Sequence, residues 1–221
     1  MKTHLDNLLK HVSGLNSNRI LDLGSGRGEF LLECARRKLN AVGLEYNLEY
    51  IKITRKLALE ENLKVDVIQG VAEKMPFLDE SFDFVNIAEV IEHVNSPEQL
   101  LKELRRVLKP GGKAYLSIPN RLGLKDQHFH LYFINWMPRF WADKIINSFG
   151  YHKDYSNKAG LQRLSEMHYY TWPNVCSLVE SSGFKFKDIR LYKVKKNPLL
   201  FVFYPILRMF FLDSFHLLLQ K

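Results

Sequence analysis

Short apolar runs alternate with stretches of helical period along the first half of the chain. Four mostly apolar runs are predicted as strands: 19–23, 41–44, 64–68 and the run that begins at Ser81. Apolar residues at helical spacing predict helices at 3–15 and 48–62. Strands that alternate with helices predict βαβ units and a mainly parallel sheet.

The same patterning continues through the second half. Ser96 is predicted as the N-cap of a helix, with Pro97 at its first position and Gln99 completing a capping box. Lys-Pro-Gly-Gly at 109–112 ends that helix, and 113–119 is predicted as the fifth strand. A later helix begins after Thr171 and closes at Gly183, and a sixth strand is predicted at 186–192.

A glycine-rich stretch at 19–30 carries the first chemical signal. It reads as a strand, a tight loop with Gly24, Gly26 and Gly28, and the start of a helix. Such a loop lets a ligand approach the backbone, and the helix start offers free N–H groups. Asp22 at the strand end suits a ligand with positive charge and would repel a pyrophosphate. The glycine spacing also differs from the G-x-G-x-x-G of nicotinamide-binding sites, which disfavours an oxidoreductase.

This stretch resembles motif I of the class I S-adenosylmethionine-dependent methyltransferases. The segment 81–94, with its Glu-x-x-Glu-His sequence, resembles motif II of small-molecule methyltransferases, especially quinone and lipid O-methyltransferases. Leu-Lys-Pro-Gly-Gly before the fifth strand is a further hallmark, so the resemblance covers 19–119. It implies one α/β domain over 1–221, a Rossmann-like three-layer α/β/α sandwich with a mainly parallel seven-stranded sheet.

The resemblance implies S-adenosylmethionine as cofactor. The residues expected to bind it are Asp22, Gly24, Ser25, Gly26, Gly28, Glu45, Tyr46, Ala72, Glu73 and Ala88. Glu45 ends the second strand, where an acid can accept both ribose hydroxyls, a feature shared with nicotinamide enzymes. Tyr46 packs either on the adenine or within the fold. Val71 stands where the family has an acid, so the adenine contact is expected from the Ala72 backbone or the Glu73 side chain.

The segment 120–170 is long and aromatic-rich. Its aromatic side chains include Phe129, Phe133, Trp136, Phe140, Trp141 and Phe149, joined by Tyr132, Tyr151 and Tyr155. In the resembled fold this region builds the acceptor pocket, so a helical aromatic cap over a bulky apolar acceptor is expected. The alternative is a helical subdomain with a small core of its own.

Methyl transfer is an in-line displacement that depends on holding donor and acceptor close. A hydroxyl acceptor must also lose a proton, and histidine suits that step. The candidate catalytic residues are His93, His128, His130 and His168. His93 could instead tie the helix entrance to the backbone. A metal site from Asp126, His128 and His130 lacks a further fixed ligand, so no metal is predicted.

The composition of the chain limits which kinds of protein and partner remain possible. The chain has 221 residues, 46% hydrophobic and 25% charged, which is ordinary for a globular domain. Its two cysteines, Cys34 and Cys176, lie far apart and support neither a disulfide framework nor a zinc cluster. The first residues contain no apolar run typical of a secretory signal, which predicts a cytoplasmic protein. The net charge of +8 fits a nucleic-acid or an anionic membrane partner.

Two alternative functions remain open beside small-molecule methylation. A nucleic-acid methyltransferase agrees with the charge, but no Asn-Pro-Pro-Tyr-like sequence follows the fourth strand to hold a flipped base, so nucleic acid is not the expected substrate. A protein that binds S-adenosylmethionine without catalysis is the other alternative. The expected acceptor is an apolar or lipid-linked small molecule, methylated on oxygen.

The last part of the chain, 197–221, is strongly apolar and follows a lysine-rich stretch at 185–196. The apolar part approaches the roughly 20 residues of a membrane span. However, Pro205, Arg208 and Asp213 fall near its middle, and each central charge costs about 2.5–3.5 kcal/mol. Two alternatives are left: a segment on an anionic membrane surface, or a seventh strand at 199–204 with the remainder packed on the domain or on a dimer partner.

Overall fold

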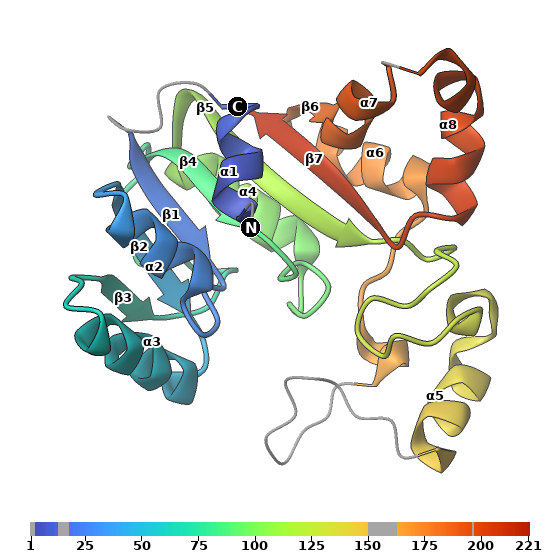
Figure 1. The fold of residues 1–221 in the computed structure, drawn as a ribbon, viewed down its shortest axis with the longest axis horizontal. Helices are drawn as coiled ribbons and strands as arrows, with labels where there is room; N and C mark the ends of the chain where they lie inside the picture. Colours follow the sequence, from blue (N-terminus) through green and yellow to red (C-terminus); the bar gives the residue numbers. More distant parts are fainter. Residues whose placement is uncertain (1–2, 13–17, 150–162, 196) are drawn as a thin grey trace.

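Seven strands form one sheet in the order β3-β2-β1-β4-β5-β7-β6 (Figure 1). The computed structural model describes residues 3–12, 18–149, 163–195 and 197–221. The strands are β1 (Arg19–Leu23), β2 (Asn40–Glu45), β3 (Asp66–Gln69), β4 (Phe82–Ile87), β5 (Leu108–Pro119), β6 (Lys185–Asp188) and β7 (Ser214–Gln220). β1 to β5 pair in parallel, and β7 runs antiparallel to both β5 and β6. The expected mainly parallel, seven-stranded sheet is confirmed.

Helices cover both faces of this sheet and complete the three layers. The described helices are α1 (His4–Leu9), α2 (Glu29–Arg36), α3 (Leu48–Glu60), α4 (Pro97–Val107), α5 (Arg139–Ser148), α6 (Trp172–Ser181), α7 (Ile189–Val194) and α8 (Pro198–Phe210), of which α5 lies away from the sheet. α1 and α2 pack with Ile20 and Phe84 on one face. α4 and α6 pack with Leu21 and Val85 on the other. Side chains alternate between faces along a strand, so neighbouring residues of β1 and β4 enter two separate cores.

The boundaries near α4 differ from the predicted ones. Ser96 accepts a hydrogen bond of 3.2 Å from the Gln99 backbone N–H, as expected of an N-cap. The reciprocal half of the capping box is not formed, because the Gln99 side chain donates to the backbone oxygen of Glu73. β5 also begins at Leu108 rather than at 113, because Leu108 already pairs with Phe82 of β4.

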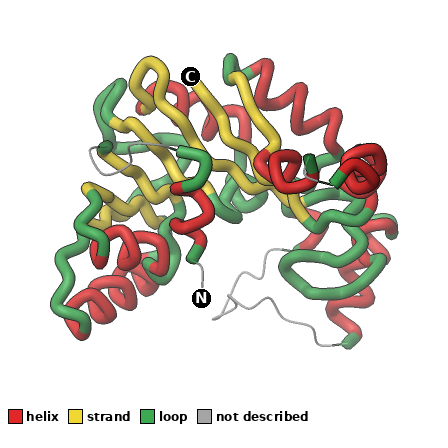
Figure 2. The backbone as a smooth tube through the Cα atoms, turned by 45° about the horizontal axis from the view of Figure 1, so that its top comes forward, coloured by secondary structure: helices red, strands yellow, loops and turns green. Residues whose placement is uncertain are grey.

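The segment after β5 leaves the sheet and forms an appendage, which we define as 120–149 and 163–170 (Figures 1 and 2). It contains α5 and two short 3₁₀ helices, Ile134–Trp136 and Leu164–Glu166. Its small core consists of Phe129, Ile134, Ala142, Ile146, Leu164 and Met167. The alternative of a helical subdomain with a core of its own is therefore the one that forms.

The aromatic side chains of this appendage do not form the expected cap interior. Phe129 is buried, whereas the other five of the six phenylalanines and tryptophans named above are exposed. The small aliphatic core leaves no room for them, and Phe133 packs edge-on against Trp136 as Phe140 does against Trp141. Tyr151 and Tyr155 lie outside the described residues.

The C-terminal part also differs from the prediction. β6 ends at Asp188 because its carboxylate accepts hydrogen bonds from the backbone N–H groups of Arg190 and Leu191 and so starts α7. The predicted strand at 199–204 is wrong, because these residues lie in α8. Asn197 caps that helix, and Pro198 occupies its first turn. The seventh strand is Ser214–Gln220. In the described part of the chain, no helix is long and apolar enough to cross a bilayer.

Candidate cofactor and acceptor site

A cleft of about 1450 Å³ opens at the carboxyl ends of β1, β2 and β4. The strand order reverses between β1 and β4, and such a switch point is where open α/β sheets bind ligands. Of the ten predicted cofactor-binding residues, nine line this cleft: Asp22, Gly24, Ser25, Gly26, Glu45, Tyr46, Ala72, Glu73 and Ala88. The topology therefore gathers residues from four separate predicted segments.

Gly28 is the exception. It is the N-cap of α2, with a φ of 84°, and does not line the cleft. A Cβ on Gly28 would lie 2.4 Å from Cγ2 of Thr54 in α3. Gly26 has a φ of 53°, and a Cβ there would meet nothing within 4 Å. The third glycine of the loop thus allows two helices to approach each other, while Gly26 keeps the loop open towards the cleft.

Glu45 holds the glycine loop in place. Its Oε2 accepts a hydrogen bond of 2.8 Å from the Gly26 N–H. Its Oε1 accepts one of 2.8 Å from the Asn47 N–H. An ionised carboxylate can accept about four hydrogen bonds, so each oxygen retains capacity for a ligand hydroxyl. The side chain can order the loop and bind a ribose at once.

Asp22 is the most perturbed acid of the cleft. It is buried, and burial raises the pKa of its carboxyl to about 7, although a hydrogen bond from Asn86 opposes that rise. In the described part of the chain, its Oδ2 and the nearby Ser25 Oγ are buried without a hydrogen-bond partner. Such groups are costly unless a ligand satisfies them. These atoms fit a ligand that carries positive charge and hydrogen-bond donors.

The predicted adenine end is more open. Tyr46 is 73% exposed, so packing within the fold does not explain it. Oε1 of Glu73 accepts a hydrogen bond of 2.8 Å from the Asn95 N–H, which engages that oxygen with the loop after β4. Val71, at the usual acid position, is 41% exposed. An adenine contact from Tyr46, Ala72 or Glu73 stays a prediction.

The four candidate histidines are distributed over two pockets. His93 lines the cleft, whereas His128 and His130 line a second pocket of about 440 Å³. Glu89 and His216 line both pockets and mark where they adjoin. His168 lines neither pocket; its backbone N–H donates to the oxygen of Glu92. Three of the four candidate histidines thus line a pocket, and their catalytic role stays a prediction.

Several residues that line the cleft were not predicted from the sequence: Asn86, Tyr115, Ser117 and His216. Asn86 carried a usable signal, because it is a polar residue inside the apolar run of β4. The parallel register places it beside Asp22. His216 had no such signal, because β7 joins β5 from almost 100 residues away. His4, expected on a solvated face, lines the cleft, and its Nε2 lies 3.0 Å from Oδ1 of Asn86.

Comparison with known sequences agrees with this geometry. Residues 21–116 match the sequence model of a family described as a methyltransferase domain. The matched residues therefore form a methyltransferase domain, and their fold is that of the S-adenosylmethionine-dependent methyltransferases. S-adenosylmethionine is accordingly the cofactor of the methyltransferase domain, and the unpartnered Asp22 and Ser25 oxygens fit its charged and hydrogen-bonding groups.

Relatives of the methyltransferase domain include two kinds of quinone-biosynthesis enzyme. A ubiquinone biosynthesis O-methyltransferase of Erwinia tasmaniensis is 32% identical over 118 residues, which are 53% of this chain and 49% of that protein. A ubiquinone/menaquinone biosynthesis C-methyltransferase of Geotalea daltonii is 33% identical over 138 residues, 59% of this chain and 58% of that protein. The chain spans about half the length of the curated relatives it matches.

Solved structures share the fold over almost the whole chain. A methyltransferase of Methanosarcina mazei has a TM-score of 0.63 at 22% identity and covers 96% of both chains. The YcgJ protein of Bacillus subtilis also has a TM-score of 0.63, at 17% identity, covering 97% of this chain and 96% of its own. The likeness in fold therefore extends beyond residues 21–116 to almost the whole chain.

Proposed function

We propose that the protein transfers the methyl group of S-adenosylmethionine to an oxygen of a small acceptor that is apolar or lipid-linked. The observation that carries this is the cleft at the β1–β4 switch point, where buried Asp22 Oδ2 and Ser25 Oγ lack partners in the described structure. The second pocket adjoins the cleft through Glu89 and His216, and its polar lining suits the hydroxyl end of the acceptor. Relatives that act in ubiquinone biosynthesis support a small-molecule acceptor.

The polar lining of the second pocket favours oxygen as the methylated atom. His128 and His130 line it, together with Asp126, Lys125 and Arg190. Histidine and carboxylate groups can take or relay the proton of a hydroxyl as the oxygen attacks the methyl carbon. His93, His128 and His130 are the catalytic histidines in this proposal.

The test is cofactor binding followed by methyl transfer. S-adenosylmethionine should raise the melting temperature, NADH should not, and Asp22→Ala should abolish the shift. Labelled S-adenosylmethionine is then offered with phenols, quinols, amines and RNA, and label should pass to the hydroxyl compounds. Label in RNA would favour the nucleic-acid alternative. Binding without transfer to any acceptor class would favour a binding protein without catalysis.

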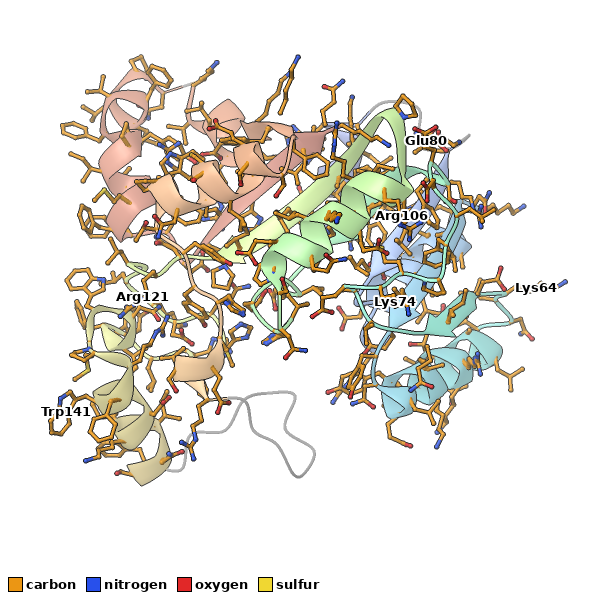
Figure 3. All side chains as sticks on the ribbon, turned by 180° about the vertical axis from the view of Figure 1, so that it is seen from behind. Lys64, Lys74, Glu80, Arg106, Arg121 and Trp141 are labelled. Carbon is orange, nitrogen blue, oxygen red and sulfur yellow. The ribbon has the colours of Figure 1, made fainter. Side chains whose placement is uncertain are left out.

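We further propose that the protein associates with an anionic membrane surface through a flank formed by α8 and the appendage. α8 exposes apolar side chains along its length: Leu199, Leu200, Phe201, Val202, Phe203, Ile206 and Met209. In Figure 3, Trp141 projects from α5 at the same edge of the molecule as the α8 side chains. Figure 1 and Figure 2 also place α5 and α8 on one side. Large exposed apolar surfaces of this kind mark interaction sites.

Charges on this flank agree with a bilayer surface. Arg208, which the sequence placed in the middle of the apolar segment, stacks 3.6 Å from the centre of the Trp172 ring and lies 3.4 Å from Asp188. It therefore does not oppose burial of the outer face of α8. Lys144 lies over the rings of Phe140 and Trp141, where its charge can meet lipid headgroups beside inserted aromatics.

Vesicle co-sedimentation tests this surface. Because β7 is a core strand, truncation after Asn197 would unfold the domain, and substitutions replace it. Val202→Ser with Phe203→Ser and Ile206→Ser should abolish binding to anionic vesicles. The control variant carries Leu59→Ser and Leu78→Ser, which replace two other exposed apolar side chains, and it should bind the vesicles as the wild type does. A protein that ignores vesicles but forms a dimer dependent on the same three residues would show that a second copy covers this flank.

A further inference from the structure

Three side chains with metal-ligand atoms meet beside the two pockets. Glu92 and His93 follow β4, and His128 comes from the appendage, 36 positions after Glu92. Oε1 of Glu92 lies 3.2 Å from Nε2 of His128 and 3.9 Å from Nε2 of His93. One ligand atom of each residue lies within 4.8 Å of the others. Among the described residues, chain folding thus brings together three possible metal ligands from two separate segments.

One oxygen of the buried Glu92 carboxylate has no hydrogen-bond partner in the part of the chain that the structure describes. Its side chain is fully buried, at 0% exposure, and its Oε2 has no hydrogen-bond partner among the described residues. Burial of a carboxylate without such partners is expensive. The contacts with His128 and His93 both involve Oε1. A bound divalent cation would use the remaining capacity of the carboxylate and offset the cost of its burial.

The loop that carries His128 is fixed independently of the cluster. Oδ1 of Asp126 accepts hydrogen bonds from the backbone N–H groups of His128, at 2.9 Å, and Phe129, at 2.7 Å. Oδ2 of Asp126 accepts one of 2.9 Å from the hydroxyl of Tyr169. Both carboxylate oxygens of Asp126 therefore hold the loop in place. They are not available to bind the metal for which the sequence analysis considered Asp126. Supporting contacts of this kind hold ligands in a binding geometry.

The cluster connects the linings of the two pockets. His93 lines the cofactor cleft, and His128 lines the second pocket. Two histidines and one carboxylate form a ligand set known from catalytic zinc sites, which keep a coordination position open for water or substrate. An open position on a cation held between the two pockets would be near both the cofactor cleft and the second pocket.

We propose that Glu92, His93 and His128 bind one divalent cation of the Zn²⁺ or Mn²⁺ type, whose open position takes the acceptor oxygen. The role of the cation rests on the proposed function. A bound cation lowers the pKa of a coordinated hydroxyl, so its proton passes to water at neutral pH. The oxygen then forms a bond to the methyl carbon as the carbon–sulfur bond breaks. The products are the methyl ether and S-adenosylhomocysteine.

The metal site is tested first without reference to activity. The full-length protein is treated with a chelator, dialysed and titrated with Zn²⁺ or Mn²⁺ by calorimetry. One equivalent should bind, and Co²⁺ should give a visible absorption spectrum typical of nitrogen and oxygen ligands. Glu92→Gln, which keeps the side-chain shape, and His128→Ala should each weaken binding by about a hundredfold or more. His130→Asn, two residues from His128, is the matched control and should retain full affinity.

Each outcome decides the proposal. Wild-type protein that binds no cation, or variants that bind as tightly as wild type, would overturn it. If a variant fails to fold, the stoichiometry and Co²⁺ spectrum of the wild type still decide. Methyl transfer that persists in the chelated protein would remove the catalytic role while the proposed function stands. A metal-binding protein that transfers no methyl group would instead remove the proposed function and keep the site.

Discussion

Asn86 Nδ2 donates a hydrogen bond of 2.8 Å to Oδ1 of Asp22, although the two residues are 64 positions apart in the chain. The parallel pairing of β1 with β4 places them side by side. Oδ1 of Asn86 can only accept, so the nearby Nε2 of His4 is the donor in their 3.0 Å contact. This row of three side chains orients the Asp22 carboxylate and leaves its Oδ2 for a ligand.

Replacing Asn86 should therefore weaken cofactor binding. Hydrogen bonds to charged groups contribute about 1.5–3 kcal/mol, so Asn86→Leu should raise the Kd for S-adenosylmethionine roughly 10- to 100-fold. Calorimetry measures this directly. Asn147→Leu, at an exposed position at the end of α5, serves as the control and should leave the Kd unchanged. Unchanged affinity in Asn86→Leu would show that Asp22 is oriented by other contacts.

Cofactor affinity should depend on pH through Asp22. Burial raises the pKa of this carboxyl to about 7. A positively charged ligand prefers the ionised form, so affinity should rise about tenfold per pH unit up to about pH 7 and then level off. In the ligand-free protein the sign is opposite: the free energy of unfolding should fall as pH rises from about 4 to about 7, because the buried acid must ionise.

Titration of the variant Asp22→Asn separates these effects. It should bind S-adenosylmethionine weakly at every pH, and its affinity should show no step near pH 7. Its ligand-free stability should also lose the fall expected of the wild type over this range. A pH step that survives in Asp22→Asn would assign the dependence to another group.

Gly28 should be intolerant of a side chain for a reason unrelated to the cofactor. Gly28→Ala places a Cβ 2.4 Å from Cγ2 of Thr54 at a φ of 84°, and strain of this kind costs about 1–3 kcal/mol. Gly111→Ala is the matched control, with a φ of 74° and nothing within 4 Å, and should cost less. Thermal unfolding compares them. Adding Thr54→Ala to Gly28→Ala should restore part of the loss; if it restores none, backbone strain alone is responsible.

Asn120 should hold α8 to the end of β5. It is fully buried, and its Nδ2 donates to the carbonyl oxygens of Arg208, Met209 and Leu212. Asn120→Ala should lower stability by about 2–3 kcal/mol and the melting temperature by about 5–10 °C. Cofactor affinity should stay the same. Asn7→Ala, at an exposed position in α1, should have little effect on either quantity.

The local sequence determined the cofactor half of this protein. The strand, glycine loop and helix at 19–30 could be predicted because apolar period, glycine conformation and helix starts are properties of neighbouring residues. Asp22 and Glu45 could be placed at one edge because parallel strands present their carboxyl ends together. Ala72, Glu73 and Ala88, which also line the cleft, were expected there from the resemblance to the methyltransferase family.

Only the tertiary structure decided the partners of those residues and the acceptor half. Whether an aromatic run lies inside or outside depends on the volume of the core it would enter, and the appendage core accommodates Phe129 but leaves Trp141 exposed. The apolar residues 199–204 fit either a strand or a helix. They are helical because Asn197 caps α8, and Ser214–Gln220 pairs with β5 as the seventh strand instead. The Glu92–His128 contact joins two segments that are 36 positions apart. Local periodicity does not predict such a contact, because it depends on how the chain folds.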